Sequence, residues 1–355
     1  MIDPGVTLHP ILMNPKAITA LLSWICALSL FAAETPSPAL LVLNKTDLTL
    51  AIVDPSTLKI VATAPTGQDP HEVIASADGK LAFISNYGGF GTGFQTLGVV
   101  DLVTQKALAS VELPGLRAPH GITQAEGKIY FTAEANRAIA RYDPVARQID
   151  WIFGSGQNRT HMIVVSKDAN QIFTSNVNSN TVSIIERASV AGAGGRAGGA
   201  RGGAANEWNV THVSVGRGPE GFDVAPDSKE LWAANSGDGT VSIVDVAQKT
   251  VSQTINVGTA ASNRLKITPD GKLALISDLR GNQLVVIDVA KREERKRIPL
   301  GAGATGILIQ PDGARAFVAV STQNALAVID LKTLEVTGRI DIGRNPDGMA
   351  WAVRN

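Results

Sequence analysis

Three histidines and one glutamate recur at matching places in four successive segments of this chain. His71, His120 and His161 each stand just before a short apolar run, and Glu220 takes the same place in the next segment. Imidazole and carboxylate groups bind Zn, Fe, Cu or Mn, and a site that keeps one position open permits water activation or Lewis-acid chemistry. These four residues therefore suggest one divalent metal ion as a cofactor.

Two other interpretations of the same residues stay open. A histidine after a proline at the start of a strand can simply bond to backbone groups of a turn. Histidines of neighbouring segments can also lie too far apart to share one ion. The segments therefore allow metal or ligand coordination, a polar funnel that binds an organic ligand or peptide, or a purely structural role.

The four segments belong to a repeat that fills the chain from Leu40 onward. The clearest copy starts at Leu231, with an apolar run (LWAAN), a polar turn (SGDG), an alternating run ending in an acid (TVSIVD) and a fourth run (TVSQTINVG). A period of about 40–45 residues with four strands is the signature of a β-propeller blade. Seven copies predict an all-β protein, a single seven-bladed propeller with four-stranded blades.

Two polar positions recur in every copy. The acid that ends the third run is expected to accept backbone N–H groups of the following turn; these acids are Asp54, Asp101, Asp143, Glu186, Asp245, Asp288 and Asp330. The polar residue that ends the second run lies on the opposite face, with the histidines; it is Asn44, Asn86, Glu134, Asn176, Asn235, Asp278 and Ser321.

The connectors that lead into the innermost strands should place one residue per blade around the mouth of the central channel. Counting back from the next turn gives His71, His120, His161, Glu220, Asn263, Thr305 and Asp347. Arg264, one residue past this ring, is expected to point into the neighbouring blade. The metal candidates are His71, His120, His161 and Glu220. The expected ligand-binding funnel consists of Asn86, Tyr87, Glu134, Asn176, Asn235, Asn263, Asp278, Thr305 and Asp347.

The two ends of the repeat region are out of phase. The first copy begins with second-strand character (LLVLN, 40–44), whereas GMAWAV at 348–353 has first-strand character. Pairing of the N- and C-terminal strands would close the ring and leave no free sheet edge at the seam. We therefore predict that Gly348–Val353 is the innermost strand of the blade formed by Leu40–Thr66.

The repeats resemble a known group of proteins. Copies such as NSGDGTVSIVD, followed by I-x-V-G and a P-D-G-K turn, are similar to the YVTN-type repeat of bacterial and archaeal YncE-like seven-bladed propellers. The resemblance covers Leu40–Asn355. It implies the fold but no particular activity, because the group includes exported proteins, surface-layer components and relatives of seven-bladed lactonases and lyases.

Residues 1–33 read as a signal peptide that precedes the propeller at 34–355. Lys16 precedes an apolar run from Ala17 to Phe31, which is short for a membrane span and typical of a signal-peptide core. Met13 is an alternative start of the chain. These features predict a periplasmic or secreted protein with no membrane span in the mature chain; the alternative is an uncleaved N-terminal anchor.

A low-complexity tract, AGAGGRAGGARGGAAN at 191–206, holds no apolar side chain larger than alanine. Such a tract cannot bury enough surface to order itself, so a flexible surface loop is expected. The chain carries 32 basic and 32 acidic residues, and this balance argues against a nucleic-acid partner.

These observations favour an exported, monomeric propeller that binds a small molecule, a peptide or a protein at its funnel face without catalysis. The alternative is a metal-dependent enzyme of lactonase, lyase or oxidoreductase type that uses the three histidines and Glu220. The sequence holds no G-x-S-x-G elbow, H-E-x-x-H, Walker or dinucleotide-binding motif. It does not specify a ligand or a metal.

Overall fold

The computed structural model describes residues 34–88, 93–188 and 208–354. The predicted signal peptide (1–33) and the Gly/Ala/Arg tract (191–206) lie outside the described residues. Short runs rich in Val, Ile and Ala, bounded by turns, form the strands, as expected for residues that suit a pleated, half-buried surface. In the described part of the chain, no helix has the length and apolar character needed to cross a bilayer.

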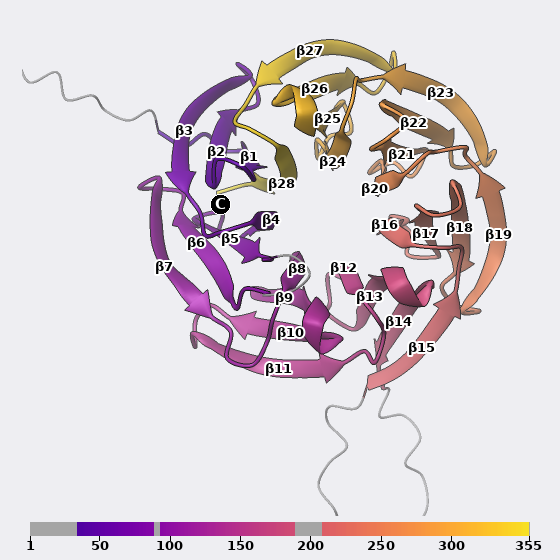
Figure 1. Cartoon of the computed structure of the whole chain (residues 1–355), viewed down its shortest axis with the longest axis horizontal. Helices are drawn as coiled ribbons and strands as arrows, with labels where there is room; N and C mark the ends of the chain where they lie inside the picture. The colour runs from indigo at the N-terminus through magenta and orange to yellow at the C-terminus, as the bar shows by residue number, and fades with distance from the viewer. Residues whose placement is uncertain (1–33, 89–92, 189–207, 355) are drawn as a thin grey trace, which may run out of the picture. The chain divides into compact units, whose positions relative to one another are not determined.

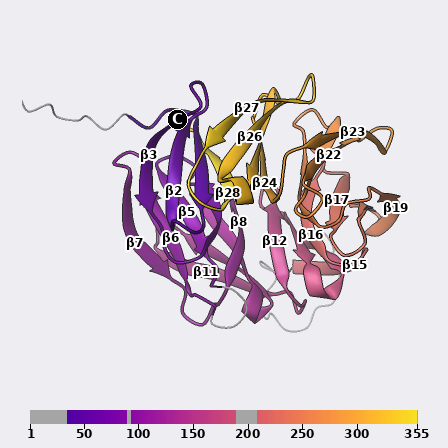
Figure 2. The same ribbon diagram turned by 45° about the horizontal axis from the view of Figure 1, so that its top comes forward.

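The strands form seven antiparallel four-stranded sheets, arranged as the blades of one propeller (Figures 1 and 2). We letter the blades A to G and give their strands from the channel outward. Blade A contains β28 (Pro346–Ala352), β1 (Ala39–Asn44), β2 (Thr49–Asp54) and β3 (Lys59–Pro65). Blade B contains β4 (Pro70–Ala75), β5 (Leu81–Asn86), β6 (Thr96–Asp101) and β7 (Lys106–Glu112). Blade C contains β8 (Pro119–Ala125), β9 (Lys128–Ala133), β10 (Ala138–Asp143) and β11 (Gln148–Gly154).

The remaining four blades follow the same order. Blade D contains β12 (Thr160–Val165), β13 (Gln171–Asn176), β14 (Thr181–Arg187) and β15 (Trp208–Ser214). Blade E contains β16 (Pro219–Val224), β17 (Glu230–Asn235), β18 (Thr240–Asp245) and β19 (Thr250–Asn256). Blade F contains β20 (Ser262–Ile267), β21 (Leu273–Asp278), β22 (Gln283–Asp288) and β23 (Glu293–Pro299). Blade G contains β24 (Ala304–Ile309), β25 (Arg315–Val320), β26 (Ala325–Asp330) and β27 (Glu335–Asp341).

The predicted closure of the ring is confirmed. β28 pairs with β1 in antiparallel register, with Ala39 opposite Ala352 and Leu41 opposite Ala350. The last strand along the chain thus becomes the innermost strand of the first blade, and β1 has partners on both sides. β1 therefore keeps no unpaired edge at the seam, and an unpaired edge is the usual weak point of an open sheet.

Apolar side chains pack between neighbouring blades and hold the ring together. One cluster joins blades A and B through residues such as Leu41, Ile52 and Ile84, all fully buried. Another joins blades F and G through Leu275 and Val318. Each fully buried side chain of this kind contributes roughly 1.5–3 kcal/mol relative to an exposed one. The ring is therefore held by sheet-to-sheet packing, since the propeller sequence contains no cysteine.

Two second strands end one residue earlier than the sequence predicted. In five blades the polar residue that closes this strand pairs with the first residue of the third strand, as Asn44 does with Thr49. In blades C and G, Ala133 and Val320 hold that place, and Glu134 and Ser321 begin short 3-10 turns. These turns are η1 (Glu134–Asn136), η3 (Ser321–Gln323) and, in blade D, η2 (Val177–Ser179). Pairing with the next strand, and not the residue type, determines where each second strand ends. Glu134 therefore lies one residue beyond the end of β9.

Candidate metal and ligand site at the channel mouth

Three imidazoles from three successive blades lie against one another at the channel mouth. His71 (β4) and His120 (β8) have ring centroids 4.8 Å apart, and His120 and His161 (β12) have centroids 3.9 Å apart. Glu220 (β16) follows, with Oε1 at 3.1 Å from Nε2 of His161. The structure thus brings together the three histidines and the glutamate that the repeat placed at equivalent positions. They line a cavity of about 270 Å³ together with Asp69, Tyr87, Arg159, Asn263, Arg264 and Asp347.

His161 lies between two carboxylates. Its Nδ1 donates to Glu134 Oε1 at 2.5 Å, while its Nε2 faces Glu220 off the direction of a hydrogen bond. Burial acts to lower the pKa of His161, but Glu220 and Glu134 outweigh it and raise this pKa above the usual value. In the absence of another cation, the site therefore favours a protonated His161.

His120 has the opposite character. The side chain is buried, with 2% of its surface exposed, and no described residue bonds to its Nδ1. Burial lowers the pKa of His120 well below the usual value, and the neighbouring His161 and His71 act in the same direction. His120 is therefore a neutral imidazole with a free lone pair or N–H in a buried cavity. Such a buried, unbonded nitrogen needs an explanation.

His71 is held by residues of blades A and B. Lys45 Nζ lies 2.7 Å from His71 Nε2, and Asp69 Oδ1 lies 3.4 Å from Nδ1. An ammonium group can only donate, so this contact makes Nε2 the acceptor and leaves the proton of neutral His71 on Nδ1. Lys45 also approaches Asp347 Oδ2 at 3.6 Å. Lys45 is the residue directly after β1, the same place that Tyr87 and Glu134 hold in the next two blades.

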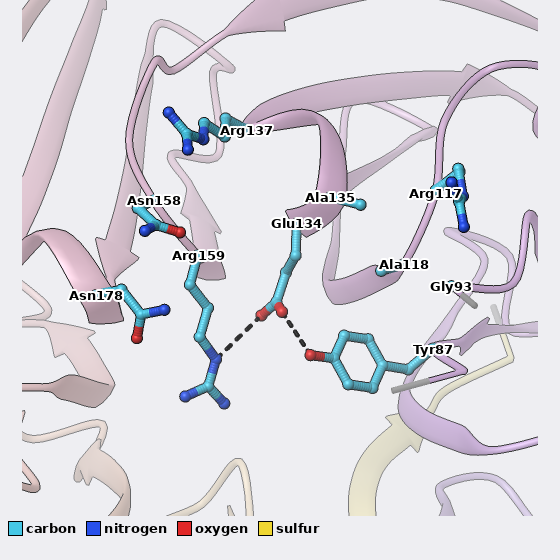
Figure 3. A pocket seen from close by; sticks show the side chains of 10 residues that line it. All are labelled: Tyr87, Gly93, Arg117, Ala118, Glu134, Ala135, Arg137, Asn158, Arg159 and Asn178. Atoms are coloured by element: carbon cyan, nitrogen blue, oxygen red, sulfur yellow. Dashed lines mark hydrogen bonds and ion pairs between the residues drawn. The ribbon is translucent and has the colours of Figure 1, made fainter. Parts of the chain in front are cut away.

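Tyr87 and Arg159 line both the channel cavity and a second pocket, and in the second pocket Glu134 lies between them (Figure 3). Tyr87 donates its hydroxyl to Glu134 Oε2 at 2.6 Å, and Arg159 Nε lies 3.8 Å from Glu134 Oε1. Burial and the neighbouring Glu134 raise the pKa of Tyr87 well above the usual value, so the phenol stays protonated. The second pocket has a volume of about 350 Å³; these three residues line it with Gly93, Arg117, Ala118, Ala135, Arg137, Asn158 and Asn178.

Arg159 also pairs with Glu220. The two guanidinium nitrogens Nη1 and Nη2 lie 3.4 and 3.2 Å from the two carboxylate oxygens. Burial acts to raise the pKa of Glu220, but His161, Arg159 and Arg264 outweigh it and lower this pKa to about 2. Glu220 therefore remains an anion over the whole physiological range of pH.

The expected orientation of Arg264 is wrong. Its guanidinium pairs with Glu72 of β4. The strand β20 of Arg264 belongs to blade F and β4 belongs to blade B, and blades G and A lie between them. Arg264 is 6% exposed, and Asp347 Oδ1 lies 4.0 Å from Nη2. The side chain turns across the channel because Glu72 offers an acid there. At the same position, Gly121 and Gly306 leave no room for a side chain, since an added Cβ would meet backbone of the next blade at 2.5 and 2.2 Å.

Several residues expected to line the funnel are bonded within the blades. The amides of Asn86, Asn176 and Asn235 donate to threonine hydroxyls of the same hairpin at 2.9, 3.0 and 2.9 Å. Asp278 accepts the backbone N–H groups of residues 260, 261 and 281, and Thr305 donates to the Pro346 carbonyl at 3.3 Å. Of the nine expected funnel residues, Tyr87, Glu134, Asn263 and Asp347 line the two cavities.

The sequence argument missed Lys45, Asp69, Glu72 and Arg159. Lys45 follows Asn44 as Tyr87 follows Asn86, so the repeat could have identified Lys45 in the first blade. Asp69 contacts His71 two residues away, so it too was within reach of local spacing. Glu72 and Arg159 depend on contacts between blades, such as the Arg159–Glu220 pair, which no local spacing encodes. Around the cavity, five carboxylates face three basic side chains, so two negative charges are unbalanced once His161 has lost its proton; the acids are Asp69, Glu72, Glu134, Glu220 and Asp347, and the bases are Lys45, Arg159 and Arg264.

The comparisons with known proteins agree on the fold. A family model described as a YNCE-like beta-propeller matches residues 11–354. A functionally unknown protein from Desulfotomaculum acetoxidans is 13% identical, with a TM-score of 0.71, over 90% of this chain and 100% of that chain. A candidate 6-phosphogluconolactonase from Bacteroides uniformis is 15% identical, with a TM-score of 0.68, over 89% of this chain and 99% of that chain.

The hydrazine synthase of Kuenenia stuttgartiensis is also similar in structure. It is 18% identical, with a TM-score of 0.61, over 79% of this chain and 89% of that chain. At such identities the likeness shows the fold alone. No protein of curated function gives a significant sequence match.

Proposed function

Because the chain belongs to the YNCE-like β-propeller family, whose fold does not fix a chemistry, we propose from the channel mouth that it binds one divalent transition-metal ion. His161 Nε2 and Glu220 Oε1 would be the first two ligands, and His120 and His71 would complete the set. The donor set suits Zn²⁺ and its neighbours in the first transition row, which imidazole and carboxylate bind well.

The observation that carries this proposal is the 3.1 Å separation of His161 Nε2 and Glu220 Oε1. Two donors bound at about 2.1 Å to one ion lie roughly 3.0–3.4 Å apart at angles between 90° and 109°. The two atoms are thus spaced as ligands of one ion, without the alignment of a hydrogen bond. The ligand atoms of His120, Glu134 and His161 also lie within 4.8 Å of one another.

Glu134 supports the proposal from the other side of the imidazole. By accepting from His161 Nδ1 at 2.5 Å, it fixes the tautomer that leaves Nε2 free for a metal. Metal-bound histidines almost always donate their second N–H to such a partner, and its loss costs 10–100-fold in affinity. Tyr87, which donates to the other oxygen of Glu134, holds this carboxylate in place.

Binding by all three imidazoles requires His71 and His120 to rearrange. In His71, Lys45 contacts Nε2 and the proton lies on Nδ1, so one of these two nitrogens must be released. The rings of His120 and His161 are tilted by only 34° at 3.9 Å, so they lie face to face and do not aim at one point. His120 must turn about its side-chain bonds to reach an ion beside His161. No described residue bonds to His120 Nδ1, so a turn costs no hydrogen bond at that atom.

The charge of the cavity favours the same ion. The excess of two carboxylates over basic groups matches one divalent cation, whereas burial of unpaired anions is costly. Four protein donors would fill a tetrahedral zinc site, and zinc can expand to a fifth position. We infer a binding site first; a lactonase, lyase or oxidoreductase activity would need a substrate that reaches this fifth position.

The test is a zinc titration of the metal-free protein, followed by elemental analysis of the purified complex. We expect one Zn²⁺ per chain, and at least roughly 100-fold weaker binding after His161→Ala, since that side chain offers a direct ligand.

His212→Ala is the matched control. His212 stands on β15, where its Nδ1 lies 3.0 Å from the Ser183 hydroxyl, outside the channel cavity. Zinc affinity should be unchanged in this variant, and circular dichroism should show that both variants keep the fold. Equal affinities of the two variants, or no stoichiometric zinc, would refute the proposal.

A further inference from the structure

We propose that the second pocket, between blades C and D, binds the oxyanion group of a small molecule, a carboxylate or a phosphate. This site does not require the metal ion, because its proposed donors are arginine and asparagine side chains. The pocket of about 350 Å³ has the size of small-ligand cavities, which start near 300 Å³.

The charges that line the pocket are one-sided. Three arginines line it, Arg117, Arg137 and Arg159, and the only acid among the lining residues is Glu134. Glu134 is already engaged by His161 and Tyr87. Figure 3 shows Arg117 on one side of Glu134 and Arg137 on the other. Within the described residues, no carboxylate lies within ion-pair distance of the Arg137 guanidinium.

The pocket also offers neutral donors. Asn158 and Asn178 lie together beside Arg159 on the same side as Arg137 (Figure 3). Arginine binds carboxylate and phosphate through two parallel N–H groups, and these charge-assisted bonds are stronger than neutral ones. The arginine side chains in this pocket thus supply only donors to a ligand, and the two amides supply donors as well as acceptors.

The backbone at Arg137 distinguishes this residue from its counterparts in most other blades. This residue has φ of +54°, in the left-handed region that costs every residue with a Cβ except, to a lesser degree, Asn and Asp. The same place after the second strand is filled by residues suited to this conformation in four other blades: Asn180, Gly239, Asn282 and Asn324. Leu48 in blade A is the exception.

Arg159 repeats this pattern at the turn into β12. Its φ is +55°; at that turn blades E, G and A use Gly218, Gly303 and Asn345, and blades B and C use Asp69 and Ala118. Two arginines therefore hold left-handed positions that Gly or Asn fills in several other blades, and both line one pocket.

The decisive variant is Arg137→Asn, which removes the charge and installs the residue that other blades use. Leu48→Asn is the matched control, because it makes the same backbone change in blade A, away from the pocket. Both variants should melt at the same temperature as the parent or higher. Isothermal titration of the metal-free protein with inorganic phosphate and, separately, with succinate is then compared at constant ionic strength.

We expect one of the two anions to bind the parent and Leu48→Asn equally, and to bind Arg137→Asn at least tenfold more weakly. The anion that binds identifies the oxyanion class. Failure of both anions to bind the parent would overturn the inference, as would equal affinity of the two variants. The result is separable from the metal proposal, because zinc affinity of Arg137→Asn should equal that of the parent.

Discussion

The two faces of this propeller use the same repeat in opposite ways. On the far face, the aspartates that end the third strands accept N–H groups of the next turn, as Asp101 does from residues 103 and 104 at 2.8 and 3.0 Å. The same pattern recurs at Asp54, Asp143, Asp245, Asp288 and Asp330. On the channel-mouth face, five blades carry imidazole or acid at the ring position, and two carry Asn263 and Thr305. Repetition thus marks a structural role, and departure from it marks where chemistry can occur.

We expect the largest effect on stability from opening the ring of blades, on which both faces depend. Deletion of residues 346–355 removes β28 and leaves β1 without its inner partner. We expect cooperative unfolding of the whole ring to disappear, because an open ring exposes unpaired edges and apolar blade faces. Calorimetry and circular dichroism measure this; a truncated protein that melts like the intact one would show that closure contributes little.

Arg264 also departs from the repeat, and variants of this residue test whether such a departure stabilises the fold instead of binding a ligand. The Arg264–Glu72 pair is buried, with 7% and 12% of the side chains exposed, so Arg264→Met leaves an unpaired buried acid. We expect a loss of about 3–5 kcal/mol in the free energy of unfolding, whereas the double change to methionine at 264 and 72 should recover most of it. Urea unfolding measures both. Equal stability of the single and double variants would mean that the pair is not coupled.

The pH dependence sharpens the contrast between His161 and an ordinary imidazole. A raised pKa in the folded state stabilises the protein fully below the unfolded value of about 6.5, and this stabilisation is lost as pH rises through the folded pKa. The metal-free parent should therefore exceed His161→Asn in stability most clearly below about pH 6.5, and the difference should shrink above it. Denaturant unfolding at several pH values measures it, and a difference that grows with pH would have the wrong sign.

Zinc affinity of the parent should change in the opposite direction over the same range. A proton on His161 must leave before the metal binds, so affinity should rise with pH through the raised pKa. Glu220, with a pKa of about 2, does not titrate there.

The smallest effect is expected on the repetitive face. Asp101→Ala removes the acceptor for two turn N–H groups and should cost about 1 kcal/mol in stability, as one modest hydrogen-bonded contact does. Zinc affinity should stay at the parent value. A change in zinc affinity would break the distinction between the two faces.

The fold and the ring positions follow from local sequence, because each blade repeats the same strand and turn chemistry. Counting along that repeat is enough to align His71, His120 and His161. The partners of these residues are less accessible: Arg264 and Glu72 are distant in sequence and meet only across the closed channel. The strand end at Ala133 is likewise fixed by pairing with Ala138, which residue type does not reveal.

The inner strand β28 carries Asp347, which approaches Lys45 at 3.6 Å and Arg264 at 4.0 Å. During synthesis this strand leaves the ribosome after every other strand described, so the last acid of the channel mouth arrives in the same step that shuts the ring. A chain that still lacks β28 contains the histidines but not Asp347, so the charges around the histidines are incomplete. A ligand that binds only the complete set of charges stabilises the closed ring by mass action. Occupancy of the channel mouth would therefore report that the ring is closed.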